Sequence, residues 1–183
     1  MSPAAASPVP AIVVMGVAGC GKSAVGSRMA RLLGLPLIEG DDFHSEHNVR
    51  KMQQGQALTD EDRAGWLRRL GAELAGCRGG AVLTCSALKA TYRESLRAAV
   101  PGLRFVHLAI GSDESLRRVA ARTGHFYPAS LVTSQFEALQ DPSAEPGVLT
   151  LEATATPDEL ARQAVAWLVP GWFEIQQCVI DYD

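Results

Sequence analysis

Short apolar runs alternate with longer amphipathic stretches along most of this chain. Apolar runs of this kind are typical of buried strands, and apolar positions repeated every three or four residues are typical of helices. The runs that predict strands are Ala11–Met15, Leu35–Ile38, Ala81–Cys85, Leu103–Ile110 and Val148–Leu151. The stretches that predict helices are Lys22–Leu33, Asp60–Ala75, Ala90–Ala99, Ser112–Arg122, Leu131–Leu139 and Pro157–Leu168. This alternation predicts an α/β fold, with a small parallel sheet of about five strands flanked by helices on both faces.

The first predicted strand leads directly into a glycine-rich segment that fits the pattern G-x-x-x-x-G-K-S. The segment is Gly16-Val17-Ala18-Gly19-Cys20-Gly21-Lys22-Ser23. In this pattern the backbone N–H groups surround phosphate oxygens, and the helix that follows adds positive potential from its N-terminus. We expect Lys22 to reach the β- and γ-phosphates and the Ser23 hydroxyl to hold Mg²⁺. The chain is therefore expected to bind a nucleoside triphosphate through these eight residues.

The length of 183 residues suits one domain with its own core and is short for two. We expect a single P-loop domain, built around this phosphate loop, over residues 11–169, because no repeat or low-complexity linker divides that span. Residues 1–10 are rich in Ala, Ser and Pro and are expected to form a disordered leader. Residues 170–183 form a tail whose pattern indicates no role.

Composition excludes several classes of protein. A net charge of −3 and a pI near 5.8 argue against a nucleic-acid partner, which would require a basic surface. No apolar run approaches the roughly 20 residues of a membrane span, so we expect no membrane partner. The four cysteines form no C-x-x-C pair, which suits reduced thiols in a cytoplasmic enzyme.

Three acids follow the second predicted strand, at Glu39, Asp41 and Asp42. Ligands of open parallel sheets bind beyond the carboxyl ends of the strands, so these acids would lie beside the phosphate loop. One carboxylate could accept the proton of an attacking substrate hydroxyl, and another could hold Mg²⁺ through water. The alternative is a solvated acidic turn or a helix N-cap. We favour Asp41 as the base and Glu39 as the water-mediated metal ligand, although the sequence alone does not decide among the three.

His44 and His47 lie close to these acids and raise the hypothesis of a transition-metal site. A zinc site would require a further Cys or His at suitable spacing, and none is evident. We therefore favour His44 as a hydrogen-bonding group for a polar substrate and His47 as a surface residue.

Two arginines stand where an anion could bind. Arg63 lies in the first turn of a predicted helix, against the helix dipole, and should have an anionic partner. That partner is either the neighbouring acids or a substrate carboxylate held by two parallel hydrogen bonds. Arg122 precedes Gly124 and Pro128, which interrupt two predicted helices as a mobile lid would. We expect Arg122 to stabilise charge on the transferring phosphoryl group.

The basic residues are fourteen Arg and only three Lys, namely Lys22, Lys51 and Lys89. In a chain that uses Arg almost throughout, Lys51 and Lys89 become candidates for positions that need a compact ammonium group. No Asn-Lys-x-Asp motif for guanine occurs, and Thr84-Cys85-Ser86 stands where motor ATPases usually carry an acid. These absences favour a small-molecule kinase over a GTPase switch or a motor ATPase.

The chain resembles the gluconokinases of the P-loop, shikimate-kinase-like type from about Ile12 to Leu168. Beyond the phosphate loop, the matching motifs are Gly40-Asp41 with His44, Asn48, Lys51-Met52 and Gly55, then Asp62-Arg63 with Trp66-Leu67, Cys85-Ser86-Ala87-Leu88-Lys89 with Tyr92-Arg93, Ala121-Arg122 with Gly124-His125-Phe126, and Gln135-Phe136-Glu137 with Leu139-Gln140. Glu39 stands where Asp is usual in that family.

The resemblance implies phosphorylation of D-gluconate on its 6-hydroxyl, with ATP and Mg²⁺ as cofactors, in an enzyme that is commonly a homodimer. Gluconate needs a cation for its carboxylate, hydrogen-bonding groups along its hydroxyls and a base at the far end. The residues that would bind it are Asp41, His44, Asn48, Lys51, Arg63, Ser86 and Lys89. Two alternatives remain: a kinase for another small hydroxylated acid such as shikimate, and a regulatory protein that hydrolyses ATP slowly.

Overall fold

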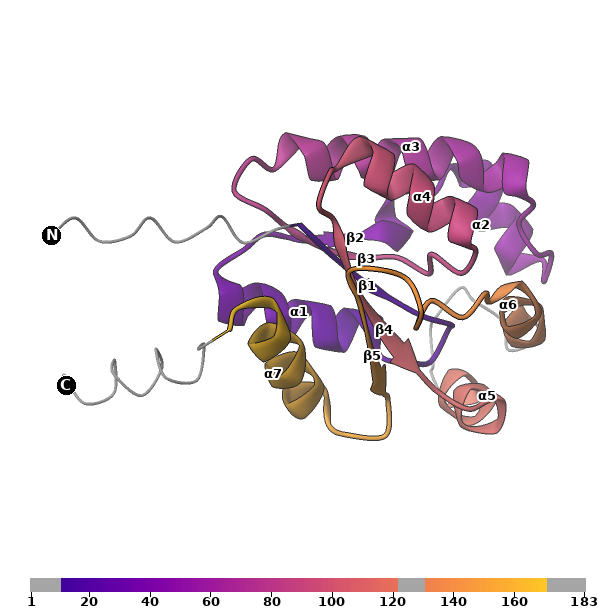
Figure 1. The fold of residues 1–183 in the computed structure, drawn as a ribbon. Coiled ribbons are helices and arrows are strands. Elements are labelled where there is room, and N and C mark those ends of the chain that lie inside the picture. The colour runs from indigo at the N-terminus through magenta and orange to yellow at the C-terminus, as the bar shows by residue number, and fades with distance from the viewer. Residues whose placement is uncertain (1–10, 122–130, 171–183) are drawn as a thin grey trace, which may run out of the picture.

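A computed structural model describes residues 11–121 and 131–170 of the chain. Its centre is one parallel sheet in the order β2-β3-β1-β4-β5 (Figure 1). The strands are β1 (Ile12–Met15), β2 (Leu37–Glu39), β3 (Val82–Thr84), β4 (Arg104–Ala109) and β5 (Val148–Glu152). The five-stranded parallel sheet predicted from the apolar runs is confirmed. Because β1 is central, the loop that follows it has the ends of β3 and β4 on either side.

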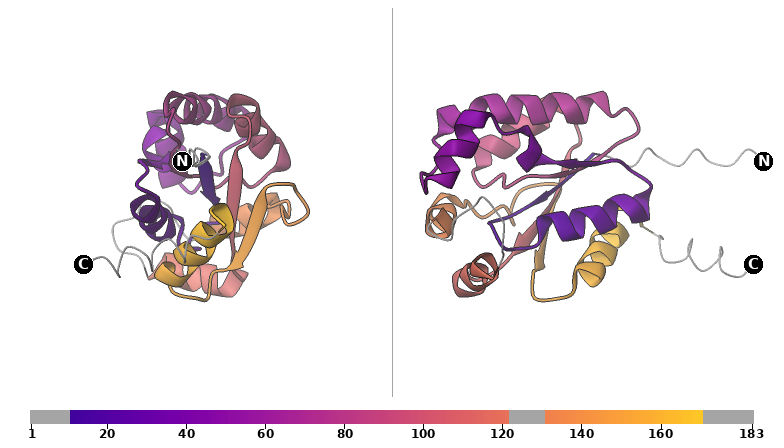
Figure 2. Two further views of the ribbon diagram at one scale, coloured as in Figure 1. Left: turned by 60° about the vertical axis from the view of Figure 1, so that its left-hand side comes forward. Right: turned by 180° about the vertical axis from the view of Figure 1, so that it is seen from behind.

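Helices cover both faces of the sheet. The described helices are α1 (Lys22–Leu33), α2 (Glu46–Gln53), α3 (Asp60–Gly76), α4 (Ala90–Ala99), α5 (Ser112–Ala120), α6 (Val132–Ala138) and α7 (Pro157–Leu168). Helices α1 and α7 lie side by side on one face, and α3 and α4 lie on the other (Figures 1 and 2). Helices α2, α5 and α6 lie toward the carboxyl ends of the strands, where the candidate site residues are found.

The central strand explains this layering. All four residues of β1 are fully buried, and they alternate between two hydrophobic clusters. Ile12 and Val14 pack with residues of α1 and α7, whereas Val13 and Met15 pack with residues of α3 and α4. A strand that is buried on both faces reads as a continuous apolar run, which is why the sequence predicts it so clearly.

The structure adds two elements that the sequence does not predict, a 3₁₀ turn η1 (Gly40–Phe43) and helix α2. In α2 the side chain of Ser45 accepts a hydrogen bond from the Asn48 N–H and caps the helix. Only Val49 and Met52 are apolar among its eight residues, so no helical period is visible. Strand β2 also extends one residue further than expected, which places Glu39 in the strand.

Several expectations concern segments that the structure does not describe. Residues 1–10, the proposed lid residues 122–130 with Arg122, and residues 171–183 lie outside the described parts of the chain. No helix within residues 11–121 and 131–170 combines the length and hydropathy needed to cross a bilayer.

Replacing Gly40 by alanine tests how closely η1 packs on β3. A Cβ atom at Gly40 would lie 2.2 Å from the carbonyl oxygen of Thr84, a backbone atom that cannot turn aside. We expect Gly40→Ala to lower the free energy of unfolding by about 1–3 kcal/mol through overpacking. Thermal and urea denaturation followed by circular dichroism measure this change.

Gly65→Ala is the matched control, because Gly65 is exposed within α3 and its added Cβ would meet only the side chain of Arg68 at 3.9 Å. An alanine there should raise the free energy of unfolding by about 0.5–1 kcal/mol through helix propensity. Equal stability of Gly40→Ala and the unmodified chain would contradict the close packing of Gly40.

Candidate active site

The phosphate loop is shaped by glycines that no other residue could replace without strain. Gly16 and Gly19 have φ angles of +141° and +78°, in the region that favours glycine. A Cβ at Gly16 would lie 2.8 Å from the carbonyl oxygen of Leu108, and one at Gly19 would lie 2.9 Å from that of Ser115. The Lys22 ammonium folds back over the loop and donates to the Val17 carbonyl at 3.0 Å. The loop therefore has the form of an anion cradle with its cation at hand.

Side chains from three neighbouring segments meet at one carboxylate oxygen: the segment after β1, the end of β2 and the end of β3. Glu39 Oε2 accepts hydrogen bonds from Ser23 Oγ at 3.0 Å and from Thr84 Oγ1 at 2.5 Å. The other oxygen, Oε1, has no protein partner among the described residues. Carboxylate and hydroxyl oxygens are the donors that Mg²⁺ prefers, and Ser23 and Glu39 present them side by side. Within the described ranges, no three His, Cys, Asp or Glu side chains gather as a metal site would require.

The 3₁₀ turn η1 presents Asp41 at the same edge of the sheet. Trp66 Nε1 donates to the Gly40 carbonyl at 2.7 Å and so holds the turn in place. The Asp41 and Asp42 side chains are exposed and have no hydrogen-bond partner in the described part of the chain. An exposed and unpaired carboxylate beside a phosphate loop is free to accept a proton from a substrate hydroxyl.

His44 stacks on Trp66, with ring centres 4.2 Å apart and an interplanar angle of 14°. Its Nδ1 atom is buried and has no hydrogen-bond partner among the described residues. Burial lowers the pKa of His44 to about 4, the Arg63 charge adds to this effect, and Asp41 opposes it. The ring is therefore neutral near pH 7 and keeps one nitrogen for a ligand. His47 is mostly exposed and lies 3.6 Å from Asp62, as expected of a surface residue.

Three charged groups surround the end of β3. Burial raises the pKa of the Cys85 thiol to about 12, and the Asp41 charge raises it further while Lys22 and Arg63 lower it. The charges of the phosphate-loop lysine, the candidate base and the candidate carboxylate receptor therefore all act on this one buried thiol.

Both lysines outside the phosphate loop are paired with acids in the first turn of α3. Lys51 Nζ donates to Asp62 Oδ2 at 2.5 Å. Lys89 Nζ donates to both carboxylate oxygens of Asp60, at 2.7 and 2.9 Å. These bonds lower the pKa of both acids, that of Asp62 to about 2. The two lysines thus hold the start of α3 to α2 and to the segment that follows β3.

Arg63 follows the two paired acids in the first turn of α3 and has no ion pair in the described part of the chain. Its guanidinium group lies over the Tyr92 ring, 5.9 Å from the ring centre. The sequence left two partners open for Arg63, the neighbouring acids or a substrate. Because Asp62 and Asp60 are already paired with Lys51 and Lys89, the Arg63 guanidinium retains its capacity to bind an anion.

The segment that carries Ser86 is held by Arg93, a residue of one matching family motif, and by its ion-pair partner Glu145, which the sequence did not indicate. Ala87 is the one non-glycine residue in the described ranges with a positive φ, of 44°. Arg93 Nη1 donates to the Ala87 and Leu88 carbonyls, both at 2.9 Å, and the fully buried Arg93 side chain pairs with Glu145. The sequence signal for this pair was that Arg93 lies on the apolar side of the helix predicted over Ala90–Ala99, since a buried arginine requires an ionic partner.

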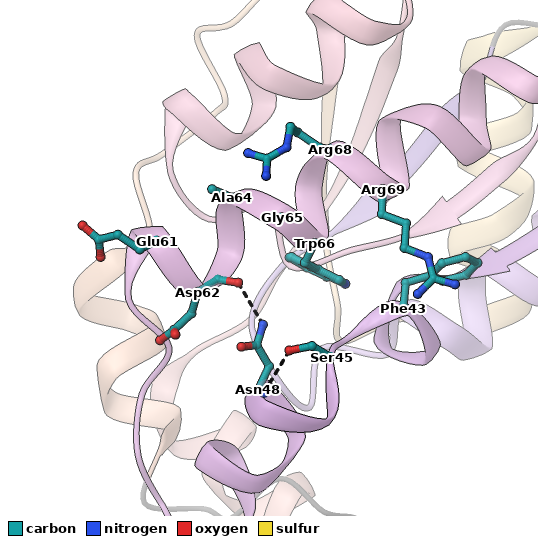
Figure 3. A pocket seen from close by; sticks show the side chains of 10 residues that line it. All are labelled: Phe43, Ser45, Asn48, Glu61, Asp62, Ala64, Gly65, Trp66, Arg68 and Arg69. Carbon is teal, nitrogen blue, oxygen red and sulfur yellow. Dashed lines mark hydrogen bonds between the residues drawn. The ribbon is translucent and has the colours of Figure 1, made fainter.

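A cavity of about 340 Å³ lies between α3 and the segment formed by η1 and α2 (Figure 3). Its lining residues are Phe43, Ser45, Asn48, Glu61, Asp62, Ala64, Gly65, Trp66, Arg68 and Arg69. The Arg69 guanidinium lies 4.8 Å from the centre of the Phe43 ring, and Asn48 Nδ2 donates to the Asp62 carbonyl at 2.9 Å. Asn48 lines this cavity, whereas the phosphate loop and Asp41 do not.

The structure thus brings most of the sequence-predicted residues to one edge of the sheet. The phosphate loop, with Lys22 and Ser23, follows β1. Glu39 ends β2 and is followed by Asp41 and His44, and Ser86 follows β3. Beside that edge, the start of α3 carries Arg63 and is contacted by Asn48, Lys51 and Lys89. Arg122 lies outside the described residues.

The chain is similar to several known proteins. The protein family described as "AAA domain" matches residues 12–146. A gluconokinase of Gluconobacter oxydans is 42% identical over 157 residues, which cover 84% of this chain and 88% of that protein. The thermosensitive gluconokinase of Escherichia coli is 41% identical over 160 residues, covering 84% of this chain and 86% of that protein.

Solved structures agree with these relatives. The crystal structure of a gluconokinase from Sinorhizobium meliloti is 44% identical, with a TM-score of 0.81, covering 89% of this chain and 93% of that one. A shikimate kinase from Acinetobacter baumannii is 18% identical, with a TM-score of 0.60, covering 87% of this chain and 93% of that one. The second likeness shows a shared fold only.

The buried His44 predicts a loss of stability in mild acid. Its pKa of about 4 in the folded protein lies below the ordinary value of 6.5, so the unfolded chain binds a proton between these values and the folded chain does not. The contribution of His44 to the free energy of unfolding is therefore fully present above about pH 6.5 and is lost as the pH falls toward 4. Between pH 7 and pH 5 we expect a loss of about 1–2 kcal/mol from this residue.

Urea denaturation at pH 7 and pH 5 measures this loss when the unmodified chain is compared with His44→Phe. Phenylalanine keeps the stacking on Trp66 but does not titrate. His107, whose pKa burial also lowers, contributes equally to both proteins and cancels in the comparison. If the unmodified chain and His44→Phe lose the same free energy of unfolding between pH 7 and pH 5, the lowered pKa of His44 is contradicted.

Proposed function

Because this chain belongs to the gluconokinase family, we propose that it transfers the γ-phosphoryl group of ATP to the 6-hydroxyl of D-gluconate. The products are 6-phospho-D-gluconate and ADP. The observation that carries the choice of substrate is Arg63, a guanidinium without an ionic partner in the described ranges, beside Asp41 and the phosphate loop. Such a site suits a small acid that carries a hydroxyl group at some distance from its carboxylate.

The phosphate loop binds the triphosphate of ATP. Helix α1 begins at Lys22 with no acidic residue in its first turn, so the positive potential of its N-terminus is not offset there. Lys22 exchanges its bond to the Val17 carbonyl for the β- and γ-phosphate oxygens. The binding energy thus comes from backbone N–H groups and one ammonium group.

Ser23 and Glu39 would hold Mg²⁺, since their oxygens already lie 3.0 Å apart. The ion, when bound, neutralises charge on the phosphate oxygens. Thr84 keeps the Glu39 carboxylate in place through its hydrogen bond to the same oxygen.

Arg63 binds the gluconate carboxylate through two parallel hydrogen bonds. The hydroxyl chain then contacts the free Nδ1 of His44, the side chain of Asn48, and Ser86. Lys51 and Lys89 each have ammonium donors beyond those used for Asp62 and Asp60, and these donors can reach the substrate.

Asp41 accepts the proton of the 6-hydroxyl as its oxygen attacks the γ-phosphorus. Arg122, from the segment outside the described residues, stabilises charge on the transferring group. We also propose that the enzyme acts as a cytoplasmic homodimer, in keeping with the family resemblance and with scattered cysteines that form no C-x-x-C pair.

A coupled assay of ADP release, run with gluconate, with shikimate and without an acceptor, tests the proposed function. We expect turnover with gluconate, at least tenfold slower turnover with shikimate, and little ADP release without an acceptor. Equal rates with and without an acceptor would instead support a regulatory ATPase, and preference for shikimate would overturn the choice of substrate.

Replacing Asp41 by asparagine removes the proposed base while keeping its size. We expect kcat with gluconate to fall by about 10²–10⁴-fold, as is usual for a positioned base. Asp42→Asn is the matched control, because Asp42 is the adjacent exposed acid of η1 and should lose less than threefold. If the larger loss follows the change at Asp42, the base has been assigned to the wrong acid.

Replacing Arg63 by methionine removes the proposed carboxylate receptor. Loss of a charge-assisted pair worth about 1.5–3 kcal/mol should weaken gluconate binding by about 10–150-fold. The KM for ATP should change by less than threefold. Arg68→Met, on the exposed side of the same helix, is the control and should leave both constants unchanged. An unchanged KM for gluconate in Arg63→Met would exclude this role.

A further inference from the structure

The peptide unit of Ala18, in the middle of the phosphate loop, is held from both sides by buried side chains. Its N–H donates to Gln135 Oε1 at 2.6 Å, and its carbonyl accepts from Ser115 Oγ at 2.7 Å. Gln135 is 7% exposed and Ser115 is fully buried. A buried amide oxygen needs a partner, and Gln135 finds that partner in the phosphate loop rather than in its own helix.

Five positions after Gln135, the same segment is attached to the loop that follows β3. The Gln140 N–H donates to the Leu88 carbonyl at 2.9 Å, and Gln140 Oε1 accepts from the Ala90 N–H at 2.7 Å. The Gln140 carbonyl also accepts from Arg93 Nη2 at 3.1 Å. Gln140 therefore binds the segment that carries Ser86 and Lys89.

Gln135 lies inside α6, which ends at Ala138, and the chain then passes through Leu139 in an extended conformation to Gln140. The two attachment points are thus only five residues apart along the chain. The only direct backbone bond between the two loops in the described ranges is a long one, from Gly16 N to the Ser86 carbonyl at 3.3 Å. Residues 135–140 therefore add a further connection between the two loops, beside the pairing of β1 with β3 and the shared contact with Glu39.

We propose that residues 135–140 act as a brace that sets the distance between the transferring phosphoryl group and the acceptor hydroxyl. Gln135 and Gln140 are positioning residues at its two ends, and neither contacts the reacting atoms. This inference rests on the proposed kinase function, because a spacing between two loops matters only if groups bound to both must react. A displacement of about 1 Å between reacting groups can lower the rate by about 10²-fold.

Gln135→Met removes the bond from the Ala18 N–H, and Gln140→Met removes the bond from the Ala90 N–H but leaves the two backbone bonds of Gln140; both keep side-chain length and helix propensity. We expect each change to lower kcat with gluconate at least tenfold. Binding of ATP in the absence of gluconate, measured by calorimetry, should weaken less than threefold, because the other N–H groups of the phosphate loop remain. Glu137→Gln, on the exposed side of α6, is the matched control and should keep full activity.

Two further variants separate the brace from a merely structural role. Because both side chains act through the same brace, the loss in the double variant should be smaller than the product of the two single losses, whereas independent losses would multiply. Gln140→Glu keeps the acceptor oxygen for the Ala90 N–H, at the start of α4, and should retain most of the activity.

The outcomes distinguish this proposal from the proposed function. The ratio of variant to unmodified rates is taken with whichever acid the unmodified protein phosphorylates, so a substrate other than gluconate corrects the function and still tests the brace. Multiplicative losses, or losses below twofold in both single variants, would overturn the brace. An unmodified protein that phosphorylates no acceptor would overturn both proposals.

Discussion

Two hydroxyl groups donate to the same oxygen of Glu39, and the rest of the candidate site depends on that junction. Ser23 belongs to the phosphate loop after β1, Glu39 ends β2 and Thr84 ends β3. Parallel strands bring their carboxyl ends to one edge of a sheet, but this arrangement alone does not fix the positions of the side chains at that edge. The shared oxygen fixes the nucleotide loop, the turn with Asp41 and the loop with Ser86 relative to one another.

Charge pairing at the start of α3 neutralises two of the acids that surround Arg63. The helix begins with acids that would offset any nearby cation, yet Lys51 and Lys89 neutralise two of them directly. Arg63 thus has no ion pair within the described residues, while Lys22 lies over the phosphate loop. In the proposed function this arrangement provides two separate anion positions, one for a triphosphate and one for a carboxylate. A kinase for a small acid requires both.

Much of this architecture could be predicted from the sequence, because burial on both faces of the sheet leaves continuous apolar runs such as Ile12–Met15. Helix α2 could not be predicted, since only two of its eight residues are apolar. The scarcity of lysine indicated Lys51 and Lys89, but their pairing with the first turn of α3 depends on contacts between distant segments. The buried pair of Arg93 and Glu145, 52 residues apart, was hidden for the same reason.

The position of the new phosphate ester tests the central claim most directly. The proton-coupled phosphorus NMR spectrum of the product formed from ATP and gluconate shows which hydroxyl group was modified. If Arg63 holds the carboxylate and Asp41 faces the far end of the chain, phosphorus is attached to the terminal CH₂ oxygen and its signal is a triplet. A doublet, from an ester on a secondary hydroxyl, or inorganic phosphate alone would contradict this account.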